Sequence, residues 1–223
     1  MNDSELELWG RCEFDLGGYS YDDIKMSGFY IVARIWKEDN PEADEKDKAK
    51  FVKKFFKGFG NRPSLKKGNP SSTVPDPLVS MLVSIRIENE FEEKTITKLH
   101  RASMASENLI GALLEEYIAI NIIDKGWASC WGTTIKATDF VSKYGDRLQI
   151  KNKTNTENSS SNKIRAGTNI DVWHRFDART GKTYWEELNE KIGQGCNLSE
   201  DEFKKFAISA IKNNPDMLNL ERV

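Results

Sequence analysis

Residues Thr138–Lys151 read TDFVSKYGDRLQIK, and this segment carries both the strand pairing and the acid–lysine pattern on which the fold prediction depends. Two strand-like runs flank Tyr144–Asp146, which suits a three-residue hairpin loop because its central glycine readily adopts positive φ. With that glycine at the centre, Asp139 lies opposite Lys151, and both share one face with Gln149. A two-residue Gly-Asp turn would shift the pairing by one residue and move Asp139 out of line.

An aspartate, an amide oxygen and a lysine on one strand face are typical of a site for a hard divalent cation. Asp139 and Gln149 offer oxygen ligands of the kind that Mg²⁺ prefers, and Mg²⁺ usually keeps several waters as well. Lys151 can orient a water or stabilise charge that builds on a phosphate. The alternative is an ordinary surface hairpin, whose Asp–Lys pair would contribute on the order of a few tenths of a kcal/mol.

The chain around the hairpin changes from a helical to a strand period. Apolar residues at helical spacing predict an amphipathic helix over 104–124, which Gly126 ends. Short strand-like runs separated by turn residues follow it, and helical segments close the chain. We therefore expect a mostly helical region over 1–103, packed on a core over 104–223 as one structural unit. The other predicted helices cover 42–57, 78–91, 184–192 and 198–212, with a connection near 93–103, and the predicted strands cover 128–135, 139–143, 147–151 and 170–176.

Composition favours one sizeable core and places the positive charge in two segments. The chain has 223 residues and a formal net charge of −2, so the totals alone do not indicate a nucleic-acid binder. Basic residues outnumber acids in Lys46–Lys67 and Arg147–Lys182, and the first segment is either a solvated amphipathic helix or a phosphate-binding surface. Three scattered cysteines, an acidic N-terminus and the lack of a long apolar run predict a soluble, cytoplasmic protein without a membrane partner.

An Asp early in one strand and Gln-x-Lys on the next resemble the signature of the PD-(D/E)XK nuclease superfamily. That resemblance implies an α/β fold with a mixed central sheet flanked by helices. It also implies a Mg²⁺-dependent site in which Asp139, Gln149 and Lys151 are catalytic and the first two bind the metal.

The resemblance further implies a catalytic, metal-binding glutamate on the preceding helix. Counting back from the Gly-Trp pair that follows this helix places the residue at Glu115, with Glu107 as the alternative. Two positions depart from the pattern. Thr138 stands where these nucleases have proline, and Gln149 replaces an acid, which leaves the number of bound metal ions open.

A narrower resemblance is to type II restriction endonucleases of the SinI family, which cut GG(A/T)CC. It implies sequence-specific, Mg²⁺-dependent cleavage of both DNA strands, in a prokaryotic cell that also holds a cognate DNA methyltransferase. A two-fold symmetric site implies a homodimer. The resemblance rests on four segments in order: ENLIGALLEEYI (107–118), TDFV (138–141), QIKNKTNTENSSSNKIRAGTNID (149–171) and WHRFDARTGKTYWEEL (173–188).

The polar segment after Lys151 is a poor core and a poor helix, because Asn, Ser and Thr bond to nearby backbone and favour turns. In a DNA-cutting enzyme it would supply base contacts, since Arg or Lys reads guanine and Asn or Gln reads adenine. A low-complexity connection is the alternative for this segment. For the whole chain, the alternatives are a structure-specific nuclease, such as a junction resolvase or repair nuclease, and an inactive DNA-binding relative. The predicted DNA-binding residues are Asn152, Lys153, Asn155, Asn158, Lys163, Arg165 and Arg175.

Overall fold

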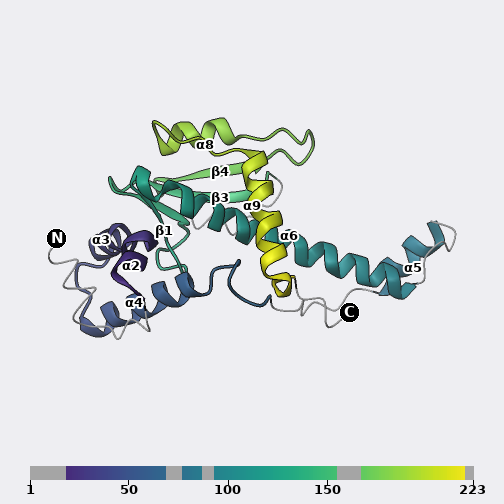
Figure 1. Cartoon of the computed structure of the whole chain (residues 1–223), viewed down its shortest axis with the longest axis horizontal. Helices are drawn as coiled ribbons and strands as arrows, with labels where there is room; N and C mark the ends of the chain where they lie inside the picture. The colour runs from purple at the N-terminus through teal and green to yellow at the C-terminus, as the bar shows by residue number, and fades with distance from the viewer. Residues whose placement is uncertain (1–18, 69–76, 87–92, 155–166, 219–223) are drawn as a thin grey trace. The chain divides into compact units, whose positions relative to one another are not determined.

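The computed structural model describes residues 19–68, 77–86, 93–154 and 167–218 (Figure 1). No helix in these ranges is long and apolar enough to cross a membrane. The elements are α2 (Tyr21–Ser27), α3 (Phe29–Asp39), α4 (Glu45–Gly60), α5 (Pro77–Arg86), α6 (Glu93–Ile122), η1 (Ile123–Lys125), β1 (Trp127–Ser129), β2 (Phe140–Ser142), β3 (Arg147–Lys153), β4 (Ile170–Phe176), α8 (Trp185–Ile192), α9 (Glu200–Asn213) and η2 (Pro215–Met217).

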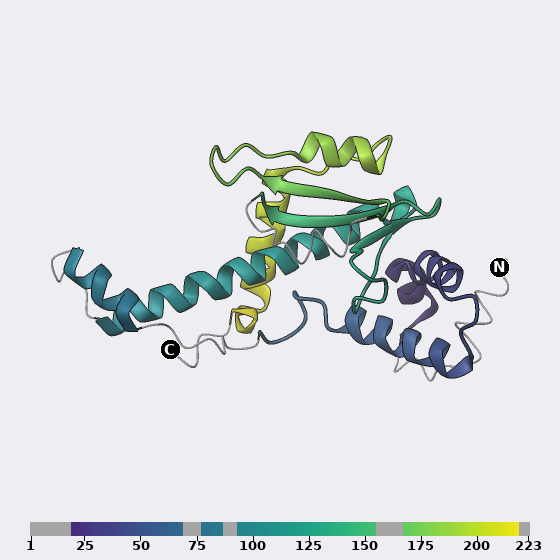
Figure 2. The same cartoon turned by 180° about the vertical axis from the view of Figure 1, so that it is seen from behind.

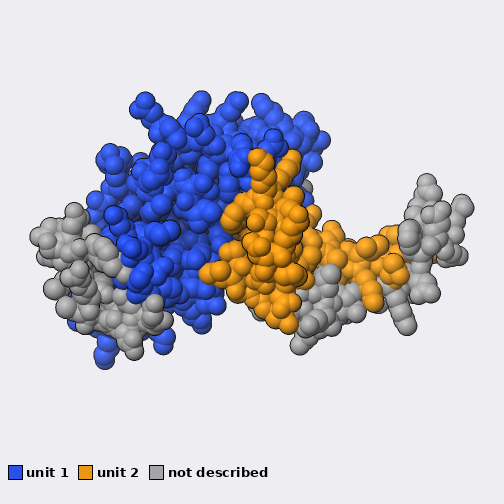
Figure 3. Space-filling view, viewed as in Figure 1, with its two compact units in different colours: residues 1–62, 114–203 blue, residues 63–113, 204–223 orange. Residues whose placement is uncertain are grey.

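The chain folds into two compact units, which Figure 3 shows in different colours. The first combines Met1–Arg62 with Leu114–Phe203, and the second combines Pro63–Leu113 with Lys204–Val223. The whole sheet and the four predicted catalytic residues belong to the first unit. The site can therefore be described within one unit, and the division near residue 103 stays a prediction.

The four strands form one mixed sheet in the order β1-β2-β3-β4. β1 pairs antiparallel with β2, and β2 pairs antiparallel with β3. β3 and β4 run parallel, which Figure 2 shows as two arrows pointing the same way. Helices pack against the sheet, and the expected α/β fold with a mixed central sheet is confirmed.

The pairing of the hairpin differs from the predicted one. Phe140 lies opposite Leu148 and Val141 lies opposite Arg147, so the register is shifted by two residues from the one that sets Asp139 opposite Lys151. A shift by two leaves every side chain on its predicted face, because strand side chains alternate with a period of two. The prediction of the register was wrong. Gln149 and Lys151 share one face of β3, whereas Asp139 lies just before β2 and is tied to β3 by the Ile150 N–H.

The hydroxyl of Ser142 explains the shifted register. It donates to Asp146 Oδ2 at 2.6 Å and accepts the backbone N–H groups of Tyr144 and Asp146 at 3.0 and 3.1 Å. The backbone N–H of Ser142 also donates to the Asp146 carbonyl at 2.9 Å. The loop is therefore Lys143–Gly145, with Gly145 at φ 96° in its last position, as three-residue hairpin loops require.

One side of the β1–β2 half packs against α2, α3 and α4. Val141 and Ala128 from the sheet join Phe29, Val32 and Phe55 from the helices in one buried apolar cluster. Burial of these side chains is the main stabilising term for this half of the unit.

Helix α4 also holds the loop between β1 and β2, which leads to Asp139. Gly58 approaches this loop so closely that a Cβ there would lie 2.2 Å from the backbone nitrogen of Gly132. Lys54 Nζ donates to the Thr133 carbonyl at 2.8 Å. The predicted strand over 128–135 is wrong beyond Ser129, because Gly132 and Thr133 turn the chain with φ values of 72° and 55°.

The other side of the sheet packs on the C-terminal part of α6 and on α8. Trp173 of β4 contacts Trp185 of α8 at a ring distance of 5.2 Å, and Tyr117 of α6 contacts the same ring at 5.8 Å. Trp127 of β1 donates its ring N–H to the Ile192 carbonyl at 3.2 Å. These contacts bring the end of α6 to the sheet and so position Glu115.

The predicted connection over 93–103 was wrong, because α6 already begins at Glu93. No proline or glycine interrupts the chain from 93 to 110, so nothing in the local sequence stops the helix. The predicted C-terminal helices are confirmed within two residues at each end, and the Ser199 hydroxyl accepts the Glu202 N–H at 3.2 Å as an N-cap of α9.

Candidate active site

Two carboxylates and a lysine from three separate elements meet at the sheet. Glu115 lies on α6, Asp139 directly precedes β2, and Lys151 lies on β3. The charges of these three groups influence one another, because Asp139 and Lys151 both shift the pKa of Glu115. The structure therefore brings together the three charged residues that the sequence assigned to one catalytic site.

The Glu115 carboxylate is partly desolvated by the protein around it. Desolvation is the largest cause that raises its pKa, the negative charge of Asp139 raises it further, and Lys151 lowers it, giving a pKa of about 8. The side chain also keeps an exposed surface, and water screens part of this effect. Glu115 is thus open to a ligand from solvent while its negative charge lacks full hydration.

Asp139 is oriented by the neighbouring strand. Its Oδ2 accepts the backbone N–H of Ile150 at 2.8 Å. Burial raises the pKa of Asp139, whereas the Ile150 N–H and the charge of Lys151 lower it. This hydrogen bond fixes the orientation of the carboxylate, and lone pairs on both oxygens are left for a ligand.

Gln149 and Lys151 share one face of β3, the strand to which Asp139 is bonded. Both side chains are partly exposed, and the alternating pattern of β3 places buried Leu148 and Ile150 on the opposite face. The amide oxygen of Gln149 is a neutral oxygen of the kind that a hard cation accepts. The donor set thus consists of two carboxylates and one amide, with a lysine beside them.

This donor set fits a hard divalent cation such as Mg²⁺. Among the described residues, no group of three or more His, Cys, Asp and Glu side chains is placed to hold a metal ion. Mg²⁺ does not need such a group, since it is commonly bound through one or two carboxylates and retained waters. The two carboxylates have raised pKa values, so a nearby cation would relieve the cost of ionising both.

The structure also separates Glu115 from the other candidate acids. Glu116 is buried and pairs with Arg62, with 3.7 Å between Oε1 and the guanidinium Nε. Glu107 lies two turns earlier on α6 and belongs to the second unit. Glu115 is the helix acid whose charge couples to Asp139 and Lys151.

Comparison with known proteins agrees with this geometry. The family model described as "SinI restriction endonuclease" matches residues 29–212 of the chain. The chain belongs to the SinI restriction endonuclease family. The match begins at residue 29, well before the first segment that resembles the family in the sequence analysis.

Two curated relatives of this SinI-family chain carry restriction-enzyme names. It is 37% identical to "Type II restriction enzyme SinI" of Salmonella infantis over 171 residues, which cover 74% of each chain. It is 40% identical to "Type II restriction enzyme Eco47I" of Escherichia coli over 148 residues, which cover 63% of this chain and 64% of that protein. The resemblance stated from the sequence is confirmed.

The raised pKa of Glu115 predicts how metal binding by this SinI-family site depends on pH. Below about pH 8 the carboxyl holds a proton that a cation must displace, so the dissociation constant should fall as pH rises and then level off above that value. One displaced proton gives at most about a tenfold change per pH unit. Calorimetric Mg²⁺ titrations between pH 6 and 9 measure this slope, and Glu115→Gln should flatten it. A pH-independent wild-type affinity would contradict the prediction.

The predicted DNA-binding residues occupy different places. Lys153 shares the sheet face of Lys151 and is partly exposed. Asn152 points to the opposite, helix-covered face, where its Oδ1 accepts from Arg175 Nε at 2.8 Å. Arg175 also pairs with Glu200 at 2.7 Å. The groups that Asn152 and Arg175 were expected to offer to DNA are thus engaged inside the protein. The other predicted contacts, Asn155, Asn158, Lys163 and Arg165, lie outside the described residues.

The sequence reasoning missed two features near the site. It did not anticipate the Ile150 N–H bond to Asp139, because a backbone contact leaves no trace in side-chain chemistry. It also passed over the turn Asp177–Lys182, which follows β4. The available signal was Asp177 followed by Thr180 and Gly181. Asp and Thr side chains bond to nearby backbone groups in tight turns, and Gly supplies positive φ there.

Proposed function

We propose that this protein is a type II site-specific deoxyribonuclease that hydrolyses both strands of DNA in a Mg²⁺-dependent reaction. The observation that carries the proposal is the group of Glu115 on α6, Asp139 bonded to the backbone of β3, and Lys151 on β3, in a chain of the SinI restriction endonuclease family. Both curated relatives are named type II restriction enzymes. Following the resemblance to the SinI enzymes, we propose GGWCC as the recognition sequence.

The roles of the site residues follow from their chemistry. Asp139, Glu115 and Gln149 would hold Mg²⁺, which supplies positive charge to activate a water and to neutralise the phosphate. Lys151 stabilises the charge that builds on the phosphate oxygens during attack by water. The Ile150 N–H keeps Asp139 in one orientation, which limits the reorganisation needed when DNA binds.

We further propose that residues 153–165 contribute the base contacts. Lys153 supports this, because it continues the exposed face of β3 beyond Lys151. A segment that leaves the catalytic strand can reach bases next to the cleaved phosphate. Its Asn, Lys and Arg side chains have the donors and acceptors that major-groove recognition needs.

We also propose that the protein acts as a homodimer, because its proposed recognition sequence is two-fold symmetric. A palindrome presents two identical half-sites, and two copies of one chain can each read and cut one of them. A cognate DNA methyltransferase in the same cell would protect the host sites. Neither partner is needed to explain the geometry of one site.

A digest of phage DNA with purified protein and Mg²⁺ tests the proposal. We expect discrete fragments whose mapped ends lie at GGWCC, and no fragments when Mg²⁺ is chelated. Cleavage confined to branched substrates would instead support a structure-specific nuclease. Binding without any cleavage would support an inactive relative, for which the replacement of an acid by Gln149 is the best argument.

A further inference from the structure

The turn that joins β4 to α8, residues Asp177–Lys182, is closed by several hydrogen bonds of its own. Asp177 Oδ1 accepts the backbone N–H groups of Arg179 and Thr180 at 2.8 and 2.7 Å, and the Thr180 hydroxyl at 3.1 Å. The Asp177 N–H donates to the Lys182 carbonyl, and the Gly181 N–H donates to the Asp177 carbonyl, both at 2.9 Å. The backbone on which Arg179 stands is therefore fixed before any ligand binds.

This turn is anchored beside the end of the strand that carries Lys151. The Ala178 N–H donates to Thr154 Oγ1 at 3.2 Å, and the Thr154 N–H donates to the Phe176 carbonyl at 3.2 Å. Phe176 also bridges to Thr183 on the far side of the turn. The turn thus extends the β3–β4 pair at its C-terminal end, three residues beyond Lys151.

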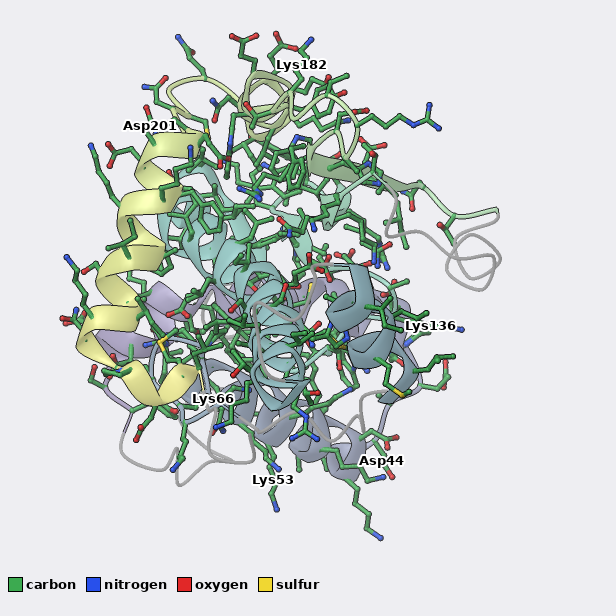
Figure 4. All side chains as sticks on the ribbon, turned by 90° about the vertical axis from the view of Figure 1, so that its right-hand side faces the viewer. Asp44, Lys53, Lys66, Lys136, Lys182 and Asp201 are labelled. Carbon is green, nitrogen blue, oxygen red and sulfur yellow. The ribbon has the colours of Figure 1, made fainter. Side chains whose placement is uncertain are left out.

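The charges of the turn are arranged for an anionic ligand. Arg179 and Lys182 are exposed, and Lys182 is labelled at the margin of the molecule in Figure 4. Among the described residues, the Arg179 guanidinium has no hydrogen bond or ion pair to another side chain. The one acid, Asp177, directs a carboxylate oxygen at the N–H groups of Thr180 and Arg179, and these bonds lower its pKa. Two cations face outward, and the acid is used internally.

We propose that the turn Asp177–Lys182 is a DNA phosphate clamp, in which Arg179 and Lys182 bind backbone phosphates next to the cleaved bond. The inference rests on the proposed function. We assign the turn to phosphates rather than bases because it is short and carries two cations three residues apart, with no Asn or Gln side chain. Phosphate contacts fix the register of a protein on DNA without reading sequence.

Salt dependence of DNA binding tests the clamp. Fluorescence anisotropy in EDTA gives the dissociation constants of a GGWCC duplex and an unrelated duplex at several salt concentrations. Arg179→Ala should weaken binding to both duplexes by a common factor and reduce the slope of log K against log[salt] by about 0.9. Arg179→Lys should keep the slope, since a phosphate accepts either cation. Lys25→Ala, an exposed lysine in the last turn of α2, is the matched control and should leave the slope unchanged.

Asp177→Ala tests whether the order of the turn matters. Removing a negative charge would by itself strengthen DNA binding, so weaker binding by this variant would show that the hydrogen bonds of Asp177 hold the clamp in place. Stronger binding would contradict a preordered clamp.

Two further outcomes would overturn the proposal. An unchanged salt slope for Arg179→Ala would show that the residue meets no phosphate. A loss confined to the GGWCC duplex would assign Arg179 to base reading. Wild-type cleavage is measured in parallel: if the wild type binds DNA with the expected slope but never cuts, the proposed function fails while the clamp stands.

Discussion

Asp139→Ala should lower the rate of DNA cleavage by roughly a thousandfold or more. The substitution removes a carboxylate that couples to Glu115 and Lys151, and so takes away half of the acidic donor set. DNA affinity measured in EDTA should remain close to that of the wild type, because a metal-binding carboxylate makes no favourable contact with phosphate. Single-turnover cleavage of a cognate duplex and anisotropy in EDTA provide the two measurements.

Asp171→Ala is the matched control for this result. Asp171 is an exposed acid on β4 whose carboxylate pairs with Lys191 at 2.8 Å, and its position in the strand places it on the opposite face from Lys151. This variant should cut at a rate near that of the wild type. If Asp139→Ala cuts as fast as Asp171→Ala, the hairpin does not carry the active site.

Lys151→Met should lower cleavage by about a hundredfold to a thousandfold, because it keeps the length of the side chain and removes its charge. A second effect follows from the electrostatics. Lys151 lowers the pKa of both Glu115 and Asp139, so its loss should raise both and shift the residual activity toward higher pH. A pH–rate profile of single-turnover cleavage records both effects.

Lys143→Met serves as the control for the lysine. Lys143 is exposed on the hairpin loop, with its Nζ 5.0 Å from the Tyr144 ring centre. Its loss should change neither the rate nor the pH profile appreciably. An alkaline shift in Lys143→Met as large as that in Lys151→Met would show that the shift reports overall charge rather than a specific neighbour of the two carboxylates.

The sequence predicted which face of the hairpin carries the site but not the pairing of its strands. Alternation places Gln149 and Lys151 on one face of β3, and this outcome is insensitive to a shift by two residues. The register depends on where the loop closes. Here the Ser142 hydroxyl bonds to Asp146 and closes the loop one residue earlier than the glycine suggested. The Ser142 side chain, by bonding to backbone groups of the loop, therefore set the register of the hairpin.

The resemblance placed the helix acid at Glu115, but the apolar periodicity of the helix does not distinguish this residue from its neighbour Glu116. Glu115 and Glu116 are adjacent, and both flank the apolar stripe of the helix. Arg62, more than fifty residues away, takes Glu116 as its partner and leaves Glu115 to the sheet. An ion pair between residues this far apart in the sequence cannot be predicted from the spacing of apolar residues along the helix. The strand Ile170–Phe176, in contrast, was predicted to the residue, because its turn signals and apolar residues agree.

The parallel pairing of β3 and β4 sets a lower limit on the length of the segment between them. Because β3 and β4 run in the same direction, the chain that leaves the end of β3 must travel back to the level of the start of β3 before β4 can begin. Arg147 pairs with Ile170 and Lys153 pairs with Phe176, so this return spans seven residues of strand, or roughly 23 Å. About seven extended residues are the minimum for that distance, and the chain has residues 154–169 available. Substitutions that keep this length leave the parallel pairing intact, whereas deletions that shorten the segment below that minimum would break the sheet.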